Sequence, residues 1–117
     1  IPEPVKGGIA GVEAVADGLK ISLHNEGIRN FLIQKINARL IDQNGSVVEE
    51  YEGEYPQRVL PERSVFLKVP MKNDGCEKAT KLGLKLFLYG SETTLTQFID
   101  LNPGCNMTGG SVPLITD

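Results

Sequence analysis

The sequence has few of the residues on which site chemistry most often depends. Among its 117 residues there is no tryptophan, one histidine (His24) and only two cysteines. A Ser-His-Asp site or a histidine-containing zinc site would need His24, which falls on the polar phase of an expected strand. A zinc ribbon needs a second pair of cysteines, and thiol catalysis favours a Cys-x-x-Cys pair or a nearby histidine. The composition therefore argues against a hydrolase, and no catalytic or metal-binding residue is predicted.

Runs of one charge and long apolar runs are also missing. The net charge is −3, and no cluster of lysine and arginine suggests binding to nucleic acid or to an anionic membrane. The apolar stretches are too short to span a bilayer. The glycines of residues 7–11 precede an expected strand rather than a helix, so they do not form a phosphate-binding loop. No cofactor is expected.

The two cysteines, Cys76 and Cys105, are equally far from the dipeptide Gly90-Ser91. On either side of that dipeptide, residues 81–89 and 92–100 alternate between apolar and polar side chains. Gly-Ser suits a two-residue type II′ turn, because glycine supplies the positive φ of the first central position. The resulting hairpin register places the cysteines opposite each other and predicts a disulfide, which implies an oxidising compartment. The alternative is two unrelated, reduced cysteines.

This register also sorts the side chains of the hairpin. Lys81 falls opposite Asp100, an opposite-charge pair of the kind that stabilises sheets. Lys81, Lys85 and Glu92 share one face. The other face carries Leu82, Leu84, Leu86, Leu88, Leu95, Ile99 and Leu101. A slip of one residue would destroy this separation, so the pattern supports the register.

The rest of the chain also reads as β-structure. Further strands are expected at 9–16, 19–25, within 31–42, at 47–51 and at 64–69, separated by turns such as Asp17-Gly18 and Asn44-Gly45. Residues 52–57, which contain Gly53 and Pro56, are predicted to form a loop. A helix is the alternative for residues 31–40. About seven short strands at regular spacing predict an all-β, immunoglobulin-like sandwich, with a small barrel as the alternative.

The predicted organisation is one domain between two polar ends. Residues 1–8 are expected to form an N-terminal tail or linker, residues 9–105 the immunoglobulin-like domain, and residues 106–117 a C-terminal tail. The chain starts without methionine and without a signal peptide, so we expect a processed or trimmed fragment.

The first expected strand is a candidate edge for binding a partner. It is short and apolar, carries one charge, and presents Ile9, Val12 and Val15. An edge strand offers backbone groups to which another strand can add. The alternative is that residues 9–16 form an ordinary first strand.

A cluster of carboxylates and tyrosines is a candidate acidic contact patch for a basic partner. It comprises Glu50, Tyr51, Glu52, Glu54 and Tyr55. A calcium site is conceivable, but the cluster lacks the regular Asp/Asn spacing of a calcium loop. The simpler alternative is a solvated strand end and loop.

Several local features follow one another in a particular order: a strand, an Asn-x-Gly corner, a second strand, a glycine hairpin and a Leu-Pro turn. They come from residues 18–27, 36–42, Asn44-Gly45 and 60–64. Over residues 18–70 the chain resembles the second domain of PapD-like periplasmic chaperones, which serve pilus assembly. The resemblance implies a β-sandwich in the oxidising periplasm, without enzyme chemistry, whose partners are pilus subunits or an usher. In that family the basic residues that hold a subunit, and the donated strand, belong to the first domain. No residue here receives those roles.

We therefore expect a non-catalytic, chaperone-like binding domain of a bacterial surface-fibre (pilus) assembly system, in the periplasm or at the cell surface. It would hold a subunit or the assembly platform through a sheet edge or face. The alternative is a stand-alone immunoglobulin-like module of a secreted or surface adhesive protein, which contacts its ligand through loops.

Overall fold

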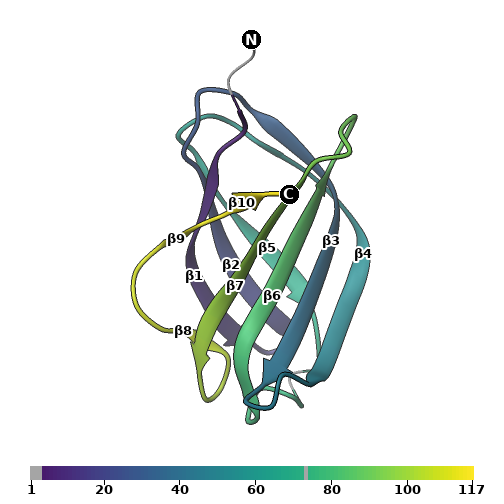
Figure 1. Cartoon of the computed structure of the whole chain (residues 1–117), viewed down its shortest axis with the longest axis vertical. Helices are drawn as coiled ribbons and strands as arrows, with labels where there is room; N and C mark the ends of the chain where they lie inside the picture. The colour runs from purple at the N-terminus through teal and green to yellow at the C-terminus, as the bar shows by residue number, and fades with distance from the viewer. Residues whose placement is uncertain (1–3, 73) are drawn as a thin grey trace.

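Alternating apolar residues give each strand one face that must leave water, and two antiparallel sheets bury these faces against each other (Figure 1). The computed structural model describes residues 4–72 and 74–117. The smaller sheet has the order β5 (Ser64–Pro70), β2 (Gly18–Asn25), β1 (Gly7–Val15) and β9 (Val112–Pro113). The prediction of an all-β sandwich is confirmed.

The larger sheet places the predicted closing hairpin at its centre. Its order is β10 (Ile115–Thr116), β7 (Thr94–Asn102), β6 (Ala79–Leu88), β3 (Phe31–Asp42) and β4 (Val47–Val59), and β8 (Asn106–Met107) also pairs with β7. The hairpin register is confirmed from Lys81 opposite Asp100 to Phe87 opposite Thr94. All seven apolar side chains predicted to share a face are buried. The Lys81 and Asp100 side chains face each other without forming an ion pair in the described structure.

The disulfide between Cys76 and Cys105 is present, and both cysteines are buried. The hairpin tip, however, is longer than the predicted two-residue turn, because pairing with β7 stops at Phe87. Beyond that point the backbone N–H of Tyr89 donates to the Leu32 carbonyl at 2.9 Å, so the chain continues along β3. Gly90 still supplies a positive φ, at 68°.

Residues 31–42 form one strand, and the helical alternative is wrong. The pairing of β3 with both neighbours shifts between Ile33 and Lys35. This bulge changes the phase of burial, so that Phe31 and Ile33 face the core before it and Ile36 and Ala38 face the core after it. The shift explains why these apolar residues fit neither a strand nor a helix period over the whole segment.

The predicted loop at residues 52–57 is wrong, because β4 continues through it to Val59. Its burial alternates from Glu49 to Val59, with Tyr51 and Tyr55 half-buried and Glu52 and Glu54 exposed. Pro56 is tolerated because β4 is the last strand of its sheet, where one side of the backbone needs no strand partner.

The predicted C-terminal tail is also wrong, because residues 106–117 contain β8, β9 and β10 (Figure 1). β9 pairs with β1 in the smaller sheet, and β10 pairs with β7 in the larger sheet. Leu114, between them, is buried, and its N–H donates to the Gly7 carbonyl at 2.8 Å. The predicted N-terminal tail at 1–8 overlaps β1, which starts at Gly7, and its residues 1–3 lie outside the described residues.

Reducing the disulfide should destabilise the domain strongly. The bond joins residues separated by 29 positions, and closing a loop of that length stabilises a fold by about 3.5 kcal/mol in the chain-entropy account. We expect urea unfolding with reductant to show that loss relative to the oxidised protein of the same sequence. Equal unfolding midpoints for the two forms would mean that the bond adds no stability.

Removing the Leu114 side chain should loosen the C-terminal segment. Leu114→Ala should cost about 2 kcal/mol, because this buried side chain fills the gap between the sheets. The matched control is Ile115→Ala, since Ile115 is 57% exposed and should change stability by less than about 0.5 kcal/mol. Thermal unfolding compares the two, and equal losses would contradict the role assigned to Leu114.

Candidate functional site

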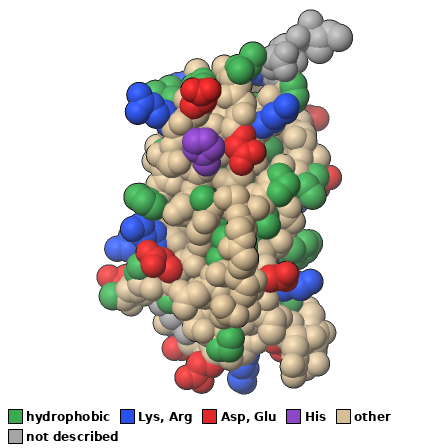
Figure 2. All heavy atoms as spheres, turned by 90° about the vertical axis from the view of Figure 1, so that its left-hand side faces the viewer, with side chains coloured by type: hydrophobic (Ala, Val, Ile, Leu, Met, Phe, Trp, Pro, Cys, Tyr) green, Lys and Arg blue, Asp and Glu red, His purple; other side chains and the backbone are tan. Residues whose placement is uncertain are grey.

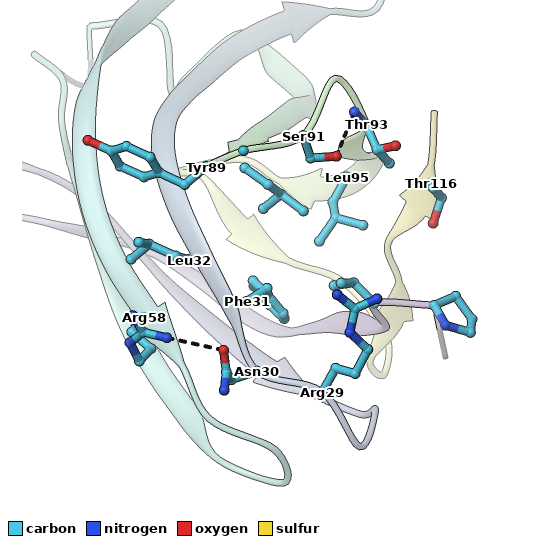
Figure 3. A pocket seen from close by; sticks show the side chains of 14 residues that line it. Arg29, Asn30, Phe31, Leu32, Arg58, Tyr89, Ser91, Thr93, Leu95 and Thr116 are labelled. Atoms are coloured by element: carbon cyan, nitrogen blue, oxygen red, sulfur yellow. Dashed lines mark hydrogen bonds between the residues drawn. The ribbon is translucent and has the colours of Figure 1, made fainter. Parts of the chain in front are cut away.

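A cleft of about 620 Å³ opens at the end of the sandwich that carries the β6–β7 loop (Figure 3). Segments far apart in the sequence form its walls: the approach to β1, the loop between β2 and β3, the end of β4, the β6–β7 loop and β10. The side chains drawn around it include Arg29, Asn30, Phe31, Leu32, Arg58, Tyr89, Ser91, Thr93, Leu95 and Thr116.

The cleft combines an apolar floor with a polar, cationic rim. Phe31 and Leu95 are buried members of the core. At the rim, Arg58 Nη1 donates to Asn30 Oδ1 at 3.1 Å, which fixes the guanidinium at the mouth (Figure 3). Ser91 Oγ accepts from the Thr93 N–H at 3.0 Å. The volume falls within the range of small-ligand sites, so the cleft suits a ligand with an apolar body and a polar or anionic group.

One buried amide shapes the wall formed by the β2–β3 loop. Asn25 is the only buried polar side chain among the described residues, and its hydrogen bonds are internal to the protein. Its Nδ2 donates to the carbonyls of Arg29 at 2.8 Å and Val59 at 3.1 Å, and its Oδ1 accepts from the Gly27 N–H at 2.9 Å. The loop that carries Arg29 is therefore tied to the end of β4, next to Arg58.

The opposite wall is held by backbone pairing. Thr94 and Asp117 exchange two backbone hydrogen bonds, of 3.0 and 2.8 Å, which join the start of β7 to the C-terminal segment. The backbone N–H of Tyr89 donates to the carbonyl of Leu32 in β3, as described above. The β6–β7 loop therefore projects from a base that is fixed on both sides.

The candidate edge residues lie in an ordinary first strand. Ile9 and Val12 are 0% and 5% exposed, and Val15 is half-buried. β9 pairs with β1 at Gly8 and Ile9, so the chain itself covers this part of the edge. The side chains of Ile9 and Val12 thus face the core and are not available to a partner.

The candidate acidic patch is divided between the two faces of β4. Glu50, Glu52 and Glu54 are exposed on its outer face, whereas Tyr51 and Tyr55 pack against the core on its inner face. The patch is therefore a row of three glutamates without its tyrosines.

Tyr55 and Glu49, on the inner face of β4, bond to β5 and to the segment that follows it. The Tyr55 hydroxyl accepts from the backbone N–H of Lys68 in β5 at 2.8 Å. The Glu49 carboxylate accepts from the N–H groups of Lys72 at 2.6 Å and Gly75 at 3.2 Å. The Tyr55 bond satisfies a backbone donor in β5, and the Glu49 bonds satisfy donors in the segment between β5 and β6.

His24 lies on the outer face of the smaller sheet, where its Nδ1 is 2.8 Å from Ser64 Oγ (Figure 2). Sequence reasoning did not identify this pair. No carboxylate bonded to the His24 ring, and no cluster of three or more His, Cys, Asp or Glu able to hold a metal, occurs among residues 4–72 and 74–117.

Comparison with protein-family models, with curated proteins and with solved structures finds no match. The part of the chain that the structure describes also contains no helix long and apolar enough to cross a membrane. The disulfide fits a protein of an oxidising compartment better than one of the reducing cytoplasm.

Replacing Asn25 by aspartate should destabilise the domain and loosen the cleft wall. The substitution keeps an oxygen for the Gly27 N–H but turns a carboxylate toward the carbonyls of Arg29 and Val59, in a fully buried position. We expect a loss of about 3 kcal/mol in chemical unfolding, because two donors are lost and a charge is buried. Asn30→Asp, at the exposed rim, is the control and should cost under about 1 kcal/mol.

Proposed function

We propose that this chain is a non-catalytic binding domain of a periplasmic, secreted or cell-surface protein, and that it takes its ligand in the loop-end cleft. The observation that carries the proposal is the cleft itself, with about 620 Å³ of space, an apolar floor and Arg58 held at its mouth. This is the stand-alone module of the sequence-based alternative, which contacts its ligand through loops. The buried disulfide supports the choice of compartment.

The sheet edges supply a second reason to favour the loop end. β9 covers the start of β1, while β8 and β10 cover the two ends of β7. At β5, the outward N–H of Lys68 is occupied by Tyr55. The protein therefore uses its own segments and side chains at three of its four edges, which leaves less backbone there for a partner.

The surface chemistry of the chain supports binding rather than catalysis. The His24–Ser64 pair lies on a sheet face, and neither residue lines the loop-end cleft. A general base needs a third group to orient it and a site in which the substrate is held. Neither accompanies His24.

A role in surface-fibre assembly is the second candidate, and β4 is the observation that favours it. β4 is 13 residues long, and in the described structure no strand pairs with its outer side. A strand of a pilus subunit or of an usher protein could add to this edge, as the resemblance to PapD-like chaperones suggests. The glutamates of β4 would favour a partner strand that carries lysine or arginine.

The loop-end proposal is tested by reversing one charge at the cleft. The labelled domain is applied to arrays of anionic glycans and of acidic peptides, together with Arg58→Glu and Arg63→Glu variants. Arg58 lines the cleft, whereas Arg63 is exposed in the β4–β5 loop and does not, so the two variants share the same net charge. We expect Arg58→Glu to reduce binding about tenfold or more and Arg63→Glu to change it less than about twofold.

If Arg58→Glu and Arg63→Glu reduced the binding of a ligand to the same degree, net charge and not the cleft would govern its binding. An array that retains nothing would contradict the proposal for these two classes of ligand. Binding of pilus subunits that is independent of Arg58 would favour the second candidate, through β4.

A further inference from the structure

A half-buried arginine on the outer face of the larger sheet has no hydrogen-bond or ion-pair partner among the residues that the structure describes. Arg39 points outward from β3, and its Nε is buried without a hydrogen-bond partner. Its guanidinium forms no hydrogen bond and no ion pair with any of the residues that the structure describes. Burying a donor of a charged group without a partner is costly, so this group is suited to an acceptor from outside the chain.

The acidic residues nearest in the sheet are already occupied. Glu50 lies directly opposite Arg39 in the β3–β4 pairing, but its carboxylate accepts from Asn37 Nδ2 at 2.8 Å. Glu52 accepts from the same Asn37 amide at 3.2 Å and lies 3.8 Å from Lys35 Nζ. Both carboxylates keep their charge, but neither forms an ion pair with the Arg39 guanidinium.

The space beside the guanidinium is a hollow of about 200 Å³ on the sheet surface. Arg39, Gly83 and Phe98 lie side by side across three strands, because Gly83 pairs with Arg39 on one side and with Phe98 on the other. A methyl group on Gly83 would lie 3.2 Å from Phe98 Cε1 and 3.3 Å from Arg39 Nη2. Glycine at this position therefore leaves room for the Phe98 ring and the Arg39 guanidinium to lie over β6.

The hollow is partly apolar, and its two cationic side chains, Arg39 and Lys85, outnumber its one carboxylate side chain, Asp117. Lys85 supplies a second positive charge, and Gln97 lies on the β7 side. Asp117 also lines the hollow, but it forms no ion pair with Arg39 or Lys85. The Phe98 side chain is 57% exposed at the margin.

We propose that this hollow binds the carboxylate of an aspartate or glutamate side chain presented by a partner polypeptide. The Arg39 guanidinium would donate to the carboxylate oxygens, and Lys85 would add charge stabilisation. The hollow is smaller than the roughly 300 Å³ at which sites for whole small ligands begin, so it suits a single side chain. The exposed Phe98 ring offers an apolar contact to the rest of a polypeptide lying over the sheet, which a free anion would not use. This surface is separate from the loop-end cleft and does not depend on it.

The test is an NMR titration of the ¹⁵N-labelled domain with a capped Ala-Glu-Ala-Glu-Ala peptide. We expect the amide signals of Gly83, Lys85 and Phe98 to move together. Arg39→Gln should weaken binding about tenfold, because it removes the charge and the guanidinium fork. Lys81→Gln is the matched control, since it removes the same charge from the same sheet face outside the hollow, and should change affinity less than about twofold.

Two further arms define the site. Gly83→Ala keeps the charge but crowds the Arg39 and Phe98 side chains, so it should displace them and weaken binding as Arg39→Gln does. Thermal unfolding confirms that both variants fold. Equal losses in the Arg39→Gln and Lys81→Gln variants would overturn the carboxylate site. So would a capped Ala-Gln-Ala-Gln-Ala peptide that binds as tightly as the glutamate peptide. Sodium sulfate that binds as tightly as the peptide, with the same dependence on Arg39, would overturn the polypeptide partner and leave a free-anion site.

Discussion

The register of β6 against β7 decides which side chains face the second sheet, and both the core and the outer surface follow from it. A shift of one residue would turn Leu84 and Leu86 toward water and Lys85 toward the core. The disulfide holds this register at the open end of the hairpin, and β3 holds it along the other side of β6. The same register sets Gly83 beside Phe98 on the outer face, so the core and the hollow next to Arg39 have a common origin.

The parts of the fold that could be predicted from the sequence are those set by neighbouring residues. The closing hairpin follows from a strict period of two and a glycine at the turn, and the cysteine pair follows from its register. The sequence predicts β4 only as far as Tyr51, because Gly53 and Pro56 are turn residues in most contexts. They are compatible with a strand here because this strand is at an edge and carries a bulge, and both conditions depend on the rest of the sheet.

The sites were less predictable, because they depend on contacts between distant segments. The cleft joins Arg58 to Thr116 and Tyr89, and no local motif links these residues. The division of the acidic patch could have been predicted from the period of two, had residues 52–57 been recognised as strand. The unpaired state of Arg39 was beyond sequence reasoning, since it depends on Glu50 accepting from Asn37 instead of from the arginine across from it.

The pairing of β9 with β1 also determines the order in which the domain can be completed. Ile9, near the start of the described chain, meets Val112, near its end, and Leu114 closes the gap between the sheets. Contacts so far apart in sequence require the largest loop closure in the domain, so they form late in folding. A chain that emerges from a ribosome or a secretion channel with its N-terminus first keeps the start of β1 unpaired on this side until β9 arrives. During that interval the start of the first strand is open to pairing with other chains, and the pairing of β9 with Gly8 and Ile9 ends that exposure.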